Sequence, residues 1–221
     1  MVVKAPSLLD IKSIADLHEQ LGYVPLDRIR LFPSPGTATM DDLIRTQNDS
    51  LRRCELVDGS IVEKEPMGAK EALFAMYLGG LISRFAEEHD LGVVLGPDGL
   101  TKMDEDLVRI PDLSFVPWSR IPNEEFPDDA ISKIIPTLTV EIVSRSNSEQ
   151  EIARRLNDFF KAGVKLVWVI DPRKHLARVY TSETRYKVID ETGTLDGGRV
   201  LPGFKLPLIK IFSSTRRRPM N

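Results

Sequence analysis

The stretch RIPDLSFVPW, residues 109–118, places a proline–aspartate pair at the start of an apolar run. A second apolar run, TLTVEIVS at residues 137–144, contains Glu141 near its centre. Side chains alternate between the two faces of a strand, so Glu141 is expected to point away from its immediate apolar neighbours. A buried carboxylate needs a cation or several hydrogen-bond donors, because its desolvation costs several kcal/mol. If the two strands are neighbours, Asp112 and Glu141 converge.

The segments around these strands alternate between strand and helix patterns. Residues 54–65, CELVDGSIVEKE, predict a hairpin with a two-residue Asp–Gly turn. Residues 149–162 have the spacing of an amphipathic helix that ends at Gly163. Further strands are predicted at residues 91–95, 106–110, 112–117, 165–171, 175–181 and 185–190. These elements predict one α/β domain with a mixed sheet and flanking helices.

A second helix is predicted over residues 69–86. Apolar residues recur at helical spacing in two rows, one through Leu73 and one through Phe74. Two apolar rows predict that this helix is largely buried. The pair Gly79–Gly80 lowers its helix propensity and permits a close approach of another element.

The composition is that of a globular protein with a real core. The chain has 221 residues, of which 42% are hydrophobic and 29% are charged. Residues 1–50 contain four prolines and predict an arm with short helices that packs on the main domain or, as an alternative, on a neighbouring subunit. Residues 51–213 form the predicted α/β domain, and residues 214–221 a flexible basic tail.

Charge and cysteine content restrict the class of protein. The net charge of −3 disfavours a protein that coats nucleic acid, although an enzyme with a local basic patch remains possible. The single cysteine, Cys54, cannot form an internal disulfide and is expected to be a small core residue. No run of eighteen apolar residues predicts a membrane span, so we expect a cytoplasmic protein with no membrane partner.

The acids Asp112 and Glu141 suit a divalent ion. Mg²⁺ prefers one or two carboxylates together with water and phosphate oxygens. A third acid, Glu71, shares a helix face with Phe74 and is expected to point inward, where it could bind an ion through water or hold a nucleophile. Each acid also has an ordinary alternative as a turn residue, a solvent-facing strand residue or a first-turn helix acid. Arg155 would by default pair with Glu151 one turn earlier.

Taken together, these motifs resemble a known family. PDLSFV, VEIVS and E-x-x-x-R-x-x-x-F-x-x-x-G-V-x-x-V-W-V-I-D-P occur in the order found in the Uma-type restriction endonuclease family. That family belongs to the PD-(D/E)XK, restriction-endonuclease-like superfamily, and the resemblance covers about residues 39 to 212. It implies a sheet flanked by helices and Mg²⁺ or Mn²⁺ bound by Asp112 and Glu141. Glu71 would assist, and Arg155 would stabilise the charged phosphate.

The sequence departs from the pattern of this family at its lysines. The usual lysine, two residues after the strand acid, is Val143 here, and the helix lysine typical of the family is Arg155. Arginine supplies charge and binds phosphate but stays protonated, so it cannot act as a base.

The leading hypothesis is a Mg²⁺-dependent endonuclease, a hydrolase that cleaves phosphodiester bonds of nucleic acid, with DNA the expected form. A homodimer is expected from the resemblance and because cleavage of two strands suits two-fold symmetry. Two alternatives stay open: a binding or assembly module that has lost turnover, and a metal phosphodiesterase acting on small nucleotides.

Overall fold

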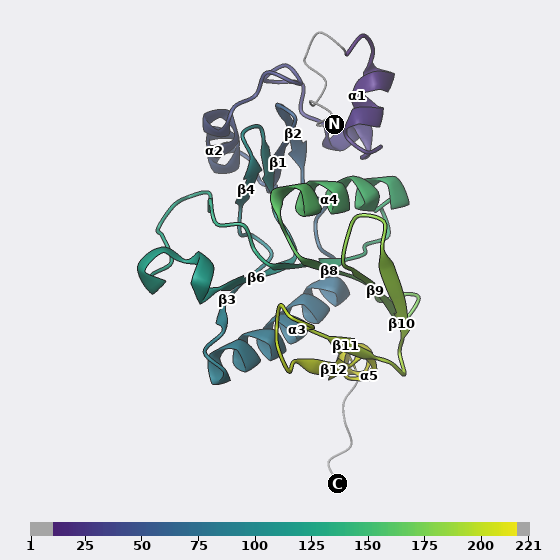
Figure 1. The fold of residues 1–221 in the computed structure, drawn as a ribbon. Helices are drawn as coiled ribbons and strands as arrows, with labels where there is room; N and C mark the ends of the chain where they lie inside the picture. Colours follow the sequence, from purple (N-terminus) through teal and green to yellow (C-terminus); the bar gives the residue numbers. More distant parts are fainter. Residues whose placement is uncertain (1–10, 216–221) are drawn as a thin grey trace.

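A mixed six-stranded sheet forms the centre of the molecule, seen in a computed structural model that describes residues 11–215 (Figure 1). Its strand order is β10-β9-β8-β7-β6-β3. Strands β7 and β8 pair in parallel, and the other four pairings are antiparallel. The bounds are β3 (Gly92–Leu95), β6 (Leu113–Pro117), β7 (Leu138–Ile142), β8 (Leu166–Asp171), β9 (Leu176–Tyr180) and β10 (Tyr186–Asp190). The predicted α/β class is confirmed.

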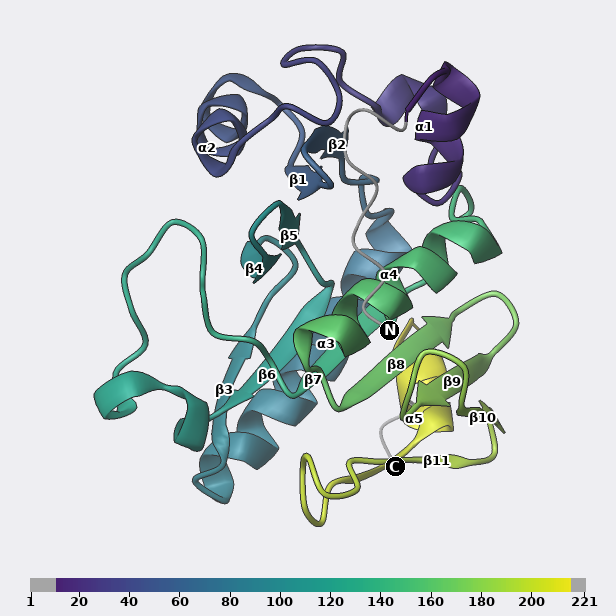
Figure 2. The ribbon, with the colours of Figure 1, turned by 45° about the horizontal axis from the view of Figure 1, so that its top comes forward.

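Two helices cover the two faces of this sheet. Helix α3 (Ala69–Glu88) lies on one face and α4 (Glu149–Ala162) on the other (Figures 1 and 2). Phe74 of α3 belongs to the same core as Val140, whereas Phe159 of α4 belongs to a second core with Val167. The predicted end of α4 is confirmed, because Gly163 adopts the left-handed conformation that terminates a helix, with φ of 103°.

The prediction that α3 is largely buried was wrong. The row of Phe74, Leu78 and Ile82 is buried against the sheet, but Leu73 of the other row is 44% exposed, and Met76, which lies in neither row, is 76% exposed. Periodicity identifies the apolar rows of a helix, but a row is buried only where another part of the protein packs against it. The C-terminal part, with β11 (Thr194–Asp196), β12 (Lys205–Pro207) and α5 (Leu208–Phe212), lies on the α3 side of the sheet (Figure 1).

The two glycines of α3 have different surroundings, which gives a matched pair of variants. A Cβ at Gly79 would lie 2.9 Å from Cδ2 of the buried Leu113, whereas one at Gly80 would meet nothing within 4 Å. We expect Gly80→Ala to stabilise the protein by about 0.5–1 kcal/mol through helix propensity. Gly79→Ala is expected to destabilise it by about 1 kcal/mol, because overpacking outweighs that gain. Urea unfolding measures both, and equal shifts would show that α3 does not rest on Leu113.

A second sheet has the strand order β2-β1-β5-β4. Its strands are β1 (Cys54–Val57), β2 (Ser60–Glu63), β4 (Thr101–Asp104) and β5 (Leu107–Arg109), of which β4 was not predicted. The predicted hairpin is confirmed: Asp58 and Gly59 have φ of 46° and 68°, the left-handed values that a tight two-residue turn requires. Cys54 is fully buried in the small core of this sheet, as expected.

The N-terminal arm lies over the second sheet and one end of α4 (Figures 1 and 2). Its helices are α1 (Ile14–Gln20), the 3-10 turn η2 (Leu26–Arg28) and α2 (Met40–Asp49), and Thr39 caps α2 reciprocally with Asp42. Ile29 forms a β-bridge with Val62 of β2. The arm is thereby attached to the hairpin.

Three short 3-10 turns complete the elements: η3 (Trp118–Arg120), η4 (Pro122–Glu124) and η5 (Ser213–Thr215). Most of the predicted basic tail, residues 216–221, lies outside the described residues. Within residues 11–215, no helix combines the length and apolar character needed to cross a membrane.

Candidate active site

Asp112 and Glu141 lie next to each other where β6 begins and β7 ends. The register pairs Leu113 with Val140, so the next position on each antiparallel strand is one of the two acids. Asp112 is buried, and its Oδ2 accepts a hydrogen bond of 2.7 Å from the backbone N–H of Ile142. The structure therefore brings together the two acids that the sequence analysis assigned to one metal ion.

Lys64 is a third charged residue beside these two acids, and its position there was not predicted from the sequence. It follows β2, and its Nζ donates to Asp112 Oδ1 at 2.9 Å and to the carbonyl oxygen of Pro97 at 3.2 Å. Val143, where the superfamily usually carries its lysine, is buried in the core beneath α4. A lysine thus enters from the hairpin, which is distant in sequence, and no local spacing in the chain reveals it.

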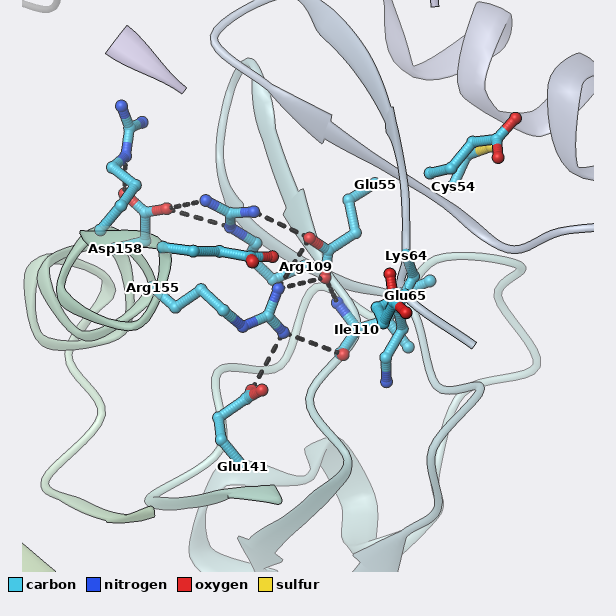
Figure 3. A network of polar contacts seen from close by, with 12 residues as sticks. Cys54, Glu55, Lys64, Glu65, Arg109, Ile110, Glu141, Arg155 and Asp158 are labelled. Atoms are coloured by element: carbon cyan, nitrogen blue, oxygen red, sulfur yellow. Dashed lines mark hydrogen bonds and ion pairs between the residues drawn. The ribbon is translucent and has the colours of Figure 1, made fainter. Parts of the chain in front are cut away.

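Arg155 lies between Glu141 and Glu55 (Figure 3). Its Nη2 donates to Glu141 Oε1 at 3.0 Å and to the carbonyl oxygen of Ile110 at 3.1 Å, and its Nη1 donates to both oxygens of Glu55 at 2.8 and 2.9 Å. The default expectation of a pair with Glu151 was wrong, because Arg155 turns toward the sheet. Its terminal N–H groups are thereby engaged by protein oxygens.

Glu55 is the centre of a buried set of charges behind the acids (Figure 3). It accepts from Arg109 Nη1 at 2.8 Å and from the N–H of Ile110 at 2.8 Å, in addition to Arg155. Arg109 in turn donates to Asp158 of α4 at 3.0 Å. Burial alone would raise the pKa of Glu55, but the two guanidinium groups outweigh it and lower the pKa to about 2. These pairs connect β1, β5 and α4 behind the site.

Glu141 has the opposite electrostatic balance. Burial raises its pKa to about 7; Arg155 opposes this rise, while the negative charge of Asp112 adds to it. A cation beside Glu141 would favour its ionised form.

The charged side chains surround one pocket with about 390 Å³ of empty space, part of it open to solvent. Asp112, Glu141, Arg155 and Lys64 line it, and they are joined there by Arg28, Glu65 and Glu151. The structure does not bring Glu71 to this lining. Glu71 lies partly exposed in the first turn of α3, with its carboxylate beside Gly68, which matches its ordinary alternative as a first-turn acid.

The donor set fits a magnesium ion better than a metal held entirely by protein. In the described part of the chain, no group of three His, Cys, Asp or Glu residues could hold a metal. Asp112 and Glu141 supply two carboxylates at an open pocket, and Mg²⁺ commonly takes one or two carboxylates with water filling the remaining positions. The residues present therefore fit Mg²⁺ or Mn²⁺ with an incomplete protein shell.

A mixed sheet between two helices, with acids where two adjacent strands meet, defines a restriction-endonuclease-like α/β protein. The fold matches a crystal structure described as a "putative nuclease belonging to DUF820" from Anabaena variabilis, with a TM-score of 0.70 and 22% sequence identity. The match covers 80% of this chain and 98% of that one. Residues 40–208 match the Uma2 family, described as "putative restriction endonuclease", and the chain belongs to that family. The resemblance found in the sequence is confirmed. A comparison with curated proteins gave no match.

Proposed function

We propose that this protein is a Mg²⁺-dependent endonuclease that hydrolyses phosphodiester bonds in nucleic acid, with DNA as the expected substrate. The observation that carries the proposal is the meeting of Asp112, Glu141 and Lys64 in one pocket, although they come from three separate strands or strand ends. Membership of the Uma2 family, described as "putative restriction endonuclease", supports the same chemistry.

In this proposal Asp112 and Glu141 hold Mg²⁺ or Mn²⁺. Such an ion supplies Lewis acidity toward a phosphoryl oxygen and lowers the pKa of a water molecule. The N–H of Ile142 and the ammonium of Lys64 fix the carboxylate of Asp112, and Arg155 fixes that of Glu141. Held in this way, both carboxylates are oriented before substrate arrives, so little reorganisation is needed.

Lys64 takes the place of the lysine that the sequence lacks at positions 143 and 155. Its ammonium lies at the metal-binding carboxylate, where it can stabilise the negative charge that develops on the phosphate during hydrolysis. Arg155 cannot act as a base, because a guanidinium stays protonated. Its proposed contact with the phosphate, and the assisting role of Glu71, stay predictions, as do the homodimer and the cytoplasmic location.

The proposal is tested by incubating the purified protein with labelled single- and double-stranded DNA and RNA. Internal cleavage is expected with Mg²⁺ or Mn²⁺ and is expected to stop when EDTA is added. Absence of cleavage of every polymer with either ion would contradict the proposal.

One observation favours the binding or assembly module as a second candidate. The terminal N–H groups of Arg155, at the position of the helix lysine typical of the family, already contact Glu55, Glu141 and the carbonyl oxygen of Ile110. A site whose arginine is engaged in this way could bind nucleic acid without turnover. Stable binding of an oligonucleotide in Mg²⁺, with no product after prolonged incubation, would select this candidate.

Lys64→Met is expected to reduce the cleavage rate by about 10²-fold, the usual effect of removing one group that stabilises developing charge. Lys102→Met is the matched control: Lys102 pairs with Glu105 at 3.0 Å on the second sheet and does not line the pocket. Steady-state cleavage rates of the two variants decide the role. Equal rates in both would mean that the lysine of the pocket has no part in hydrolysis.

A further inference from the structure

Arg28 reaches the pocket from the part of the N-terminal arm that precedes the region matched to the family, residues 40–208. It is the last residue of the 3-10 turn η2, and only 4% of its side chain is exposed. It lines the same pocket as Asp112 and Glu141. A buried arginine from outside the family region therefore borders the proposed reaction site.

The contacts of Arg28 leave part of its guanidinium unused. Its Nε donates to the carbonyl oxygen of Glu63 at 2.7 Å. Its Nη1 lies 3.0 Å from Glu151 Oε1 and 3.9 Å from Glu65 Oε2, but it has no partner of hydrogen-bond geometry among the described residues. A guanidinium carries five N–H donors, so Arg28 retains hydrogen-bonding capacity at the pocket.

The other two cations of the pocket are more fully engaged. Arg155 contacts protein oxygens through both terminal nitrogens, although its Nε has no hydrogen-bond partner among the described residues, and Lys64 is held by Asp112 and Pro97. Arginine presents its N–H groups in a planar fork that matches two oxygens of a phosphate. Of these three cations, Arg28 is the one best suited to bind an incoming phosphate.

We propose that Arg28 binds a phosphate group of a nucleic-acid strand in this pocket, and that the arm is therefore part of the binding site. The identity of the strand rests on the proposed function. In the free protein Glu151 balances the charge of Arg28, and the phosphate competes with this carboxylate for the guanidinium. Glu151 is itself held by Asn147, which donates to its other oxygen at 3.2 Å.

The competing explanation is that Arg28 only fastens the arm to the domain. Arg30 offers a control for it, since it lies two residues along the same arm and also contacts the hairpin. Its Nε is 2.8 Å from Glu63 Oε1 and its Nη2 donates to Ser50 at 3.0 Å, but Arg30 does not line the pocket. A fastening role predicts similar effects for both arginines.

The test measures the affinity of a fluorescent single-stranded DNA oligonucleotide by anisotropy in EDTA, over a range of salt concentrations. Arg28→Gln is expected to weaken binding by about 10-fold, the effect of losing hydrogen bonds to a charged group. It should also reduce the slope of log affinity against log salt by about 0.7, the value of one phosphate contact on a single strand. Arg30→Gln is expected to leave both quantities unchanged.

Glu151→Gln separates the two explanations by the sign of its effect. If Arg28 binds phosphate, removing the competing carboxylate of Glu151 is expected to tighten oligonucleotide binding. If Arg28 only fastens the arm, Glu151→Gln breaks the same ion pair as Arg28→Gln and should have the same effect on binding. If Arg28→Gln does not fold, the double variant Arg28→Gln/Glu151→Gln removes both buried charges together and is expected to show the same loss of affinity. Wild-type affinity and salt slope in a folded variant lacking Arg28 would overturn the proposal.

The outcome also separates this proposal from the proposed function. If the wild-type protein binds the oligonucleotide through Arg28 but never cleaves it with Mg²⁺ or Mn²⁺, the phosphate site stands and the nuclease activity fails. If the wild-type protein cleaves and Arg28→Gln cleaves with unchanged KM and kcat, the activity stands and the role of Arg28 fails.

Discussion

Asp112→Asn is expected to reduce Mg²⁺-dependent cleavage by about 10³-fold. A metal ion contributes several kcal/mol of transition-state stabilisation, and each 1.36 kcal/mol corresponds to about tenfold in rate. Asparagine keeps a side-chain oxygen that can accept from the N–H of Ile142, so the strand contact survives. What disappears is the negative charge that would bind the ion and that now pairs with Lys64.

The measurement is the initial cleavage rate as a function of Mg²⁺ concentration, with thermal unfolding of the same samples to show that the variant is folded. Asp129→Asn is a matched control, because Asp129 also faces a lysine, Lys133 at 3.9 Å, but lies exposed and away from the pocket. Its rate should equal that of the wild type. Cleavage by Asp112→Asn at the wild-type rate would show that the metal ligands have been assigned wrongly.

Glu55→Gln is expected to lower the free energy of unfolding by about 3–5 kcal/mol at neutral pH, because it removes the buried countercharge that two buried arginines share. Glu55 is 1% exposed and contacts both Arg109 and Arg155. Urea unfolding measures the loss. Glu105→Gln removes an exposed pair with Lys102, which is expected to matter by less than about 1 kcal/mol. If Glu55→Gln lowers the free energy of unfolding by as little as Glu105→Gln does, the buried ion pairs of Glu55 do not stabilise the fold.

The same measurement has a defined pH dependence. The pKa of Glu55 is about 2 in the folded protein, below its ordinary value of 4.5. A depressed pKa stabilises the folded state above the unfolded value, and this contribution is lost as the pH falls toward the folded value. The difference in stability between wild type and Glu55→Gln should therefore be constant from neutral pH to about pH 5 and shrink between about pH 4.5 and pH 2.

The elements that the sequence predicted are those specified by local patterns. The hairpin turn at Asp58 and Gly59 and the end of α4 at Gly163 depend on backbone conformations that few residues adopt. The short strands β4, β11 and β12 were missed, because each has only one Leu or Met in its three or four residues and so shows no apolar run to recognise.

The residues of the candidate site also fall into two groups: those that local patterns predict and those whose position depends on packing. Asp112 and Glu141 could be paired in advance, because each lies at or in a strand pattern and the two strands are consecutive along the chain. Lys64 and Arg28 could not, since they are 48 and 84 residues from Asp112 and their approach depends on how the hairpin and the arm pack. Arg155 likewise pairs with Glu55, which is 100 residues away in sequence, and not with its helical neighbour Glu151.

The contacts that the two terminal nitrogens of Arg155 make with four protein oxygens also restrict how this site can change. A lysine at position 155 would carry its charge and its donors on one nitrogen, and would lack the planar fork that contacts Glu55 through one nitrogen and Glu141 and Ile110 through the other. Relatives with lysine at this helix position are therefore expected to carry a different residue where this chain has Glu55. We therefore expect positions 55 and 155 to vary together among relatives. Replacing only one of these residues by that of a relative would break the contact between them, whereas replacing both would preserve a compatible pair.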